Sequence, residues 1–182
     1  MSRERALLIL PLALILTGCW TGPALFTAAD AARSLEDGNY RLAEPGSSVS
    51  SGDILTISTQ RDGSFLVTGP EHPWRVLAVP LAKAEPDRFI LQLQQTDPKR
   101  PERSMKATYM LLDMAKQHPV ITILACDAEI AAAVEASGGF IARDPQSASS
   151  CGFTDTAILK QRIAAAGQDL LEPDIELIRV AE

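Results

Sequence analysis

The chain has 182 residues, of which 46% are hydrophobic and 22% charged, as in folded globular proteins and unlike disordered ones. Its 23 Asp and Glu outnumber 17 Lys and Arg, and this net charge of −6 argues against nucleic acid as a partner, because duplex binding needs a basic face. Two His and three Cys provide few ligands for a dedicated zinc site. We therefore expect no metal and no other cofactor.

The first 18 residues have the pattern of an export signal. Arg3 and Arg5 give a positive start, and residues 6–16 then form an uninterrupted apolar run. A transmembrane helix needs about 20 apolar residues, whereas this run is shorter and contains Pro11. We therefore expect residues 1–18 to be a signal peptide that is removed from the mature protein.

The end of this segment, Leu16-Thr17-Gly18-Cys19, resembles the lipobox of bacterial lipoproteins, in which Leu and two small residues precede a Cys. The resemblance implies cleavage between Gly18 and Cys19 and attachment of diacylglycerol to the Cys19 sulfur. It also implies a fatty acyl group, such as palmitate, on the new amino group. The alternative is an ordinary signal peptide whose cleavage site happens to lie beside a Cys.

Two or three acyl chains on one residue would hold the mature chain firmly on a membrane of the cell envelope, with its folded part in the periplasm. In the sorting rule that the resemblance implies, Asp after the lipidated Cys retains a lipoprotein at the inner membrane. Because this position is Trp20, the outer membrane is expected instead. We expect the Trp20 indole to rest in the interfacial region of the bilayer. The mature chain would carry 15 basic and 22 acidic side chains, so lipid rather than charge must supply the affinity.

The two remaining cysteines, Cys126 and Cys151, form an even pair. Exported proteins occupy an oxidising compartment, where cysteines pair, so we predict a disulfide bond between them. Closing a loop of this size contributes about 3 kcal/mol in the chain-entropy account. The alternative is a pair of buried free thiols.

Patterns typical of β-strands extend from residue 40 to residue 124. Residues 54–59 and 65–68 flank Asp62-Gly63, a dipeptide typical of a hairpin turn. Another strand is expected over residues 74–80. A second hairpin is expected from residues 107–114 and 120–124.

Residues 89–94 alternate cleanly and predict a half-buried antiparallel strand. Phe89, Leu91 and Leu93 lie on one face of this strand, and Gln92 and Gln94 lie on the other.

The last third of the chain changes to a helical period. Asp127 can cap a helix over residues 128–137. Thr154 or Asp155 can cap a second helix over residues 156–166. The expected buried stripe of this second helix consists of Ile158, Leu159 and Ile163.

A final strand is expected over residues 175–180. The predicted fold class is α+β: a mostly antiparallel β-sheet, a meander, with two short helices in the C-terminal third. We expect a single globular domain over residues 38–182, preceded over residues 19–37 by the lipidated Cys and a tether. Residues 26–35 could instead form a short helix, and residues 120–139 could form a parallel strand–helix unit.

Residues with catalytic or binding chemistry are sparse. His72 and His118 are formal acid–base candidates, although both are expected in exposed loops. A basic cluster in the loop around residues 96–106 is interpreted as solvated rather than as a binding patch; it consists of Lys99, Arg100, Arg103 and Lys106. Trp74 begins a strand and is expected in the core.

The leading hypothesis is a membrane-anchored envelope lipoprotein with a non-enzymatic binding or structural role, acting with another envelope protein. One alternative is a carrier whose sheet encloses a lipid or another small apolar ligand. A third and less favoured class is a hydrolase with a site assembled from distant loops. No catalytic residue is nominated.

Overall fold

The computed structural model describes residues 20–45, 50–70, 73–95, 106–124, 126, 128–142, 150–166 and 175–180. Leu16, Thr17, Gly18 and Cys19, which carry the resemblance to a lipobox, lie outside these residues.

Eight of the described strands form a closed antiparallel barrel. They are β2 (Gly38–Ala43), β3 (Ser50–Thr59), β4 (Phe65–Thr68), β5 (Trp74–Ala82), β6 (Glu85–Gln95), β7 (Ala107–Asp113), β8 (Val120–Ile123) and β11 (Ile175–Arg179). Outside the barrel lie β1 (Trp20–Gly22), β9 (Phe140–Ala142), β10 (Ser150–Gly152), the helices α1 (Ala128–Ala136) and α2 (Thr156–Ala166), and a 3₁₀ turn, η2 (Ala28–Asp30).

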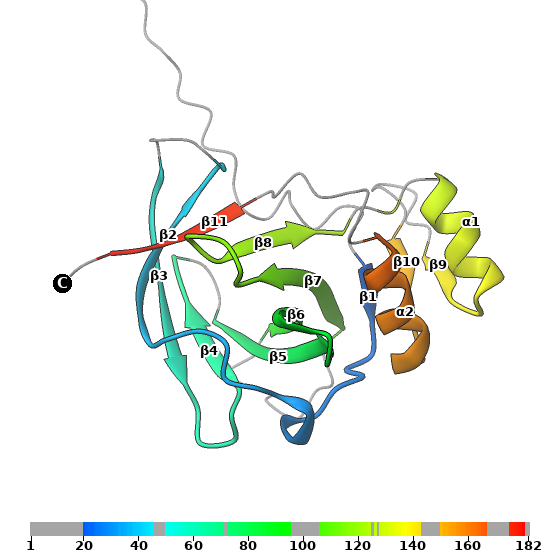
Figure 1. The fold of residues 1–182 in the computed structure, drawn as a ribbon, viewed down its shortest axis with the longest axis horizontal. Coiled ribbons are helices and arrows are strands. Elements are labelled where there is room, and N and C mark those ends of the chain that lie inside the picture. Colours follow the sequence, from blue (N-terminus) through cyan, green and yellow to red (C-terminus); the bar gives the residue numbers. More distant parts are fainter. Residues whose placement is uncertain are drawn as a thin grey trace, which may run out of the picture.

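The barrel is a meander closed by its last strand (Figure 1). Each strand from β2 to β7 pairs with the next in the chain, and β11 then lies between β8 and β2. Leu177 of β11 is opposite Leu42, and Glu176 is opposite Val120. The expected antiparallel meander is therefore confirmed, and the sheet is closed rather than open.

The alternative of a parallel strand–helix unit over residues 120–139 is not formed. The strand β8 is followed by α1, as that unit would require, but β8 pairs antiparallel with both of its neighbours, β7 and β11. Among the described strands, the parallel pairing is that of β1 with β10.

Turns and bulges give the barrel its curvature. The predicted Asp62-Gly63 hairpin joins β3 to β4, and Gly63 has φ +84°, a conformation that glycine adopts without strain. The register shifts between Arg41 and Ala43 on β2 and between Pro80 and Ala82 on β5. Such bulges bend a strand and increase its twist, and Pro is tolerated at them.

One hydrophobic cluster fills the barrel. Its buried members come from seven of the eight strands: Tyr40, Ile57, Phe65, Val76, Ala78, Phe89, Leu91, Leu112 and Leu177. An eight-stranded barrel is just wide enough for side chains to fill it or for one small ligand to bind. In this barrel the described inward-facing side chains fill the interior.

A second cluster lies between the outer face of the barrel and the elements around it. Leu77, Val79, Ile90 and Leu111 point outward from β5, β6 and β7. They belong to one cluster with Trp20 of β1 and with Leu159 and Ile163 of α2. The barrel is therefore buried on both faces along these three strands, which makes the molecule two-layered on one side (Figure 1).

The two predicted helices are confirmed. In α2, Leu159 and Ile163 are fully buried and Ile158 packs against the same cluster. The Asp155 carboxylate caps this helix by accepting hydrogen bonds from the backbone N–H of Ala157 and Ile158, at 2.8 and 3.0 Å. The expected cap of α1, Asp127, lies outside the described residues.

The segment after the expected lipidation site differs from the expectation. Trp20 is 1% exposed and packs on Phe153, with ring centroids 4.8 Å apart, so its indole is in the core and not available to a bilayer. Phe26 is also buried, and η2 replaces the short helix considered over residues 26–35. From Trp20 onward the expected tether is part of the folded body. A three-residue strand is too short for its alternation to be recognised in a sequence.

Candidate functional site

Beside Trp20 the structure brings Cys126 and Cys151 to disulfide-bonding distance. Their sulfur atoms are 2.06 Å apart and their Cα atoms 5.5 Å apart, the pairing that the cysteine count predicts. Cys151 is fully buried on β10, and Cys126 lies between β8 and α1. The bond therefore fastens β10 to the end of the barrel strand β8.

The short strand β1 is held from both sides at this place. It pairs antiparallel with β7, where Trp20 is opposite Tyr109, and parallel with β10, where Thr21 is opposite Gly152. The Phe153 N–H donates to the Thr21 carbonyl at 3.1 Å. Because β1 lies between the barrel and β10, it joins the barrel to the disulfide-linked part.

Buried hydrogen bonds of the side chains of Gln92 and Tyr109, called here the Gln92 lock, hold the chain that follows β1 in place. The Gln92 side chain is fully buried; its Oε1 accepts hydrogen bonds from the N–H groups of Leu25 and Phe26, both at 2.9 Å, and its Nε2 donates to the Phe26 carbonyl at 3.1 Å. The Tyr109 hydroxyl donates to the Pro23 carbonyl. Burial raises the pKa of Tyr109 to about 12, so the phenol keeps this proton at neutral pH.

An open depression lies at the β3–β4 hairpin, lined mainly by polar residues of the turn and by Arg75 of β5. The Asp62 carboxylate accepts hydrogen bonds from the Ser64 hydroxyl at 2.6 Å, the Ser64 N–H at 3.0 Å and Arg75 Nη2 at 2.7 Å. These bonds lower the pKa of Asp62 to about 2, the Ser64 hydroxyl contributing most. A carboxylate so occupied stabilises a turn and is unsuited to accept a proton near neutral pH.

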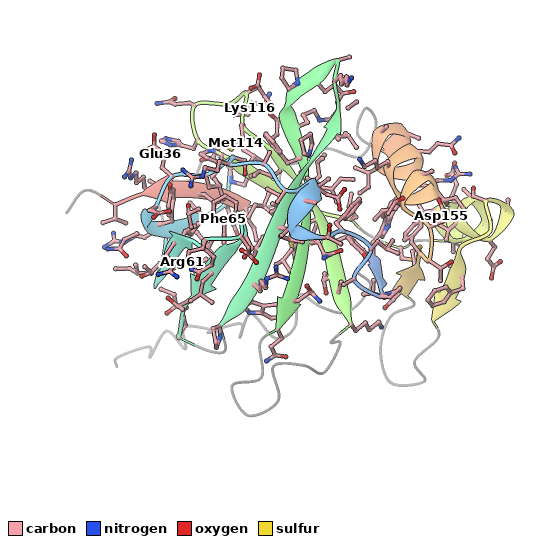
Figure 2. The ribbon with its side chains drawn as sticks, turned by 90° about the horizontal axis from the view of Figure 1, so that it is seen from below. Glu36, Arg61, Phe65, Met114, Lys116 and Asp155 are labelled. Atoms are coloured by element: carbon pink, nitrogen blue, oxygen red, sulfur yellow. A yellow bond between two sulfur atoms is a disulfide. The ribbon has the colours of Figure 1, made fainter. Side chains whose placement is uncertain are left out.

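This hairpin and the disulfide-linked part lie at opposite ends of the molecule. In Figure 2, Arg61 and Phe65 are on one side, with Glu36, and Asp155 at the start of α2 is on the other. The depression and the disulfide-linked part are therefore separate features.

The remaining candidate residues do not come together as a site. His118 is half-buried in the β7–β8 loop, and Lys106 is exposed just before β7. Trp74, for which a core position is expected, is half-buried and packs against the barrel core. Four other candidates, His72, Lys99, Arg100 and Arg103, lie outside the described residues. Within the described ranges, no group of three or more His, Cys, Asp or Glu side chains could hold a metal ion.

Neither α1 nor α2, the two α-helices in the described part of the chain, is long and apolar enough to cross a bilayer. Comparison with known protein families, with curated protein sequences and with solved structures finds no match.

The sequence pattern does not single out Gln92 and Tyr109. It places Gln92 on the polar face of an alternating strand, and that face is buried because a distant segment, residues 23–26, lies on it. Ile90, which precedes Gln92 on the same face and is fully buried, is the signal in the sequence that this face is covered.

Proposed function

We infer that this chain is an exported protein of the bacterial cell envelope, anchored by lipid on Cys19, whose barrel has a non-enzymatic binding or structural role. The observation that carries the proposal is the pairing of Cys126 with Cys151. This pairing suits an oxidising compartment and leaves Cys19, at the end of the lipobox-like segment, as the third cysteine.

The form of the barrel supports a role without catalysis. Its interior is occupied by side chains, and the lock at Gln92 and the carboxylate of Asp62 are engaged in holding the fold. A closed barrel of this kind suits the support or binding of another envelope protein. The outer membrane is the proposed location, because Trp20 rather than Asp follows Cys19.

Fractionation of cells that express Cys19→Ser tests the anchor. The unsubstituted protein should incorporate labelled palmitate and sediment with membranes, and Cys19→Ser should lose both properties. The matched control is the double variant Cys126→Ser, Cys151→Ser, which removes two other cysteines and should keep the label. Labelled, membrane-bound Cys19→Ser would refute the proposal.

A carrier of a small apolar ligand is the second candidate. The closed eight-stranded barrel favours it over a hydrolase, because a barrel of this size can hold one small ligand. Against it stands the contiguous cluster of buried side chains inside the barrel. Native mass spectrometry of protein extracted from membranes separates the carrier from the supporting role: a bound apolar molecule in stoichiometric amount would favour the carrier, and apo protein alone would count against it.

A further inference from the structure

The folded body begins immediately after the proposed lipidation site. Trp20 is buried, and its strand β1 is paired on both sides, with β7 and with β10. One peptide bond joins Cys19 to Trp20, so their Cα atoms are about 3.8 Å apart. A lipid on Cys19 would therefore have no spacer to let the folded body move away from the bilayer.

We propose that the end of the molecule formed by β1, β10 and β9 docks directly on the membrane surface, with Phe140 among the lipid headgroups. This proposal rests on the proposed function, since the lipid on Cys19 is what brings this end to the bilayer. It replaces the usual picture of a domain on a flexible tether by one in which the orientation of the domain is fixed.

The position of Phe140 fits this role. Thr21 is opposite Gly152, and Gly152 is opposite Phe140, so Phe140 is two strands, or about 10 Å, from β1. It is 41% exposed, and β9 is the last strand of the sheet. The Phe140 ring covers Gly152, where a Cβ would be 2.3 Å from ring atoms. An apolar ring held in this way can contact the bilayer with little loss of conformational freedom.

Docking by this end determines which surface faces away from the membrane. In the ring of barrel strands β3 is opposite β7, the strand to which β1 is attached. Figure 1 shows β3 toward one end of the longest axis of the molecule and β9, beside α1, toward the other. The β3–β4 hairpin and its polar depression would then point away from the bilayer, where another envelope protein could reach them.

Charge does not drive this docking, because the mature chain has 22 acidic and 15 basic side chains. Anionic headgroups would repel it, whereas a zwitterionic surface would not. Vesicles of dioleoylphosphatidylcholine that contain a lipid with brominated acyl chains are therefore the suitable probe, since bromine quenches tryptophan emission at short range.

The test compares two substitutions in the full lipid-modified protein, Phe140→Trp and Ile54→Trp. Both residues are large, hydrophobic and similarly exposed, at 41% and 43%, and Ile54 lies on β3. The signal of the unsubstituted protein, which has two Trp, is subtracted. The Trp at position 140 should be quenched about threefold more than the Trp at position 54. Equal quenching at the two positions, or none at either, would overturn the docking proposal.

Flotation with vesicles separates failure of the docking from failure of the anchor. If both variants float and the two positions are quenched equally, the anchor stands and the docking is refuted. If the protein carries no lipid and does not float, the proposed function fails and the docking with it.

A measurement on the unsubstituted protein avoids any effect of the substitutions on folding. Bound to vesicles, the segment 137–142 should exchange its amide hydrogens more slowly than in soluble Cys19→Ser, and residues 53–58 should be unchanged. Equal exchange of the segment 137–142 in the two forms would contradict the docking.

Discussion

Gln92 connects two segments that are far apart in the sequence. Its side-chain amide bonds three backbone groups of Leu25 and Phe26, which have left the sheet. The two groups of Phe26 are buried, and the Leu25 N–H also donates to the Tyr109 hydroxyl at 3.2 Å. A buried donor or acceptor that loses its partner costs about 1–3 kcal/mol. The lock therefore holds the segment after β1 against the barrel.

Gln92→Leu tests this lock. The substitution keeps an apolar volume in the core but leaves the backbone groups of residues 25 and 26 without the amide. We expect the free energy of unfolding to fall by about 3 kcal/mol, measured by urea unfolding of soluble Cys19→Ser protein. Tyr109→Phe is the graded comparison: it removes the hydrogen bond to the Pro23 carbonyl and the longer one from the Leu25 N–H, which keeps Gln92 as an acceptor, and should cost only about 1 kcal/mol. Equal effects of the two substitutions would contradict the account.

The stability of the β3–β4 turn should depend on pH through the ionisation of Asp62. Its pKa is lowered from 3.8 to about 2 in the folded protein, chiefly by the hydrogen bond from the Ser64 hydroxyl. Its ionised form therefore stabilises the fold above about pH 4, and this contribution is lost as the pH falls from about 4 to about 2. Asp62→Asn should lower the urea midpoint at pH 7 and approach the unsubstituted protein at pH 2.

Ser64→Ala gives the matched measurement for Asp62. Loss of the hydroxyl should raise the pKa of Asp62, so this variant should lose its stability at a higher pH than the unsubstituted protein does. A difference between Asp62→Asn and the unsubstituted protein that stays constant from pH 7 to pH 2 would show that the charge of Asp62 has no part in the turn.

At the scale of elements, local signals predict more than distant pairings do. The Asp62-Gly63 turn and the helix start at Asp155 depend on neighbouring residues, and the structure has both. The insertion of β11 between β8 and β2 depends on residues far away from it in the sequence, and no local pattern encodes it. The burial of Trp20 has the same origin, since its partners on β7 and β10 lie far along the chain.

One part of the candidate site could likewise be predicted from the sequence, and another part could not. Counting cysteines predicts the pair Cys126 and Cys151, because only one pairing is possible once Cys19 is set aside. The Gln92 lock could not be predicted, because a strand pattern says which residues share a face and not what covers that face.

The disulfide makes its own prediction at this scale. It spans 25 positions and fastens β10, which in turn supports β1. Reduction should lower the free energy of unfolding by about 3 kcal/mol, measured by urea unfolding with and without a reductant. The double variant Cys126→Ser, Cys151→Ser should have the reduced stability and show no response to the reductant. If the reductant also lowered the unfolding free energy of that variant, the loss of stability would not come from this disulfide.

At the scale of the whole molecule, a filled barrel is joined through β1 to a smaller layer with β9, β10 and both helices (Figure 1). The proposed lipid site directly precedes this junction. An anchor at that place would fix the orientation of the whole barrel relative to the membrane, because β1 is paired on both sides. The function of the protein would then depend on which surface the anchor leaves accessible.

Mass spectrometry of the amino-terminal peptide of the mature protein tests the central claim most directly. The account predicts that the peptide begins at Cys19 and carries diacylglycerol on its sulfur and an acyl chain on its amino group. A mature amino terminus at any other residue, or a Cys19 without lipid, would contradict it.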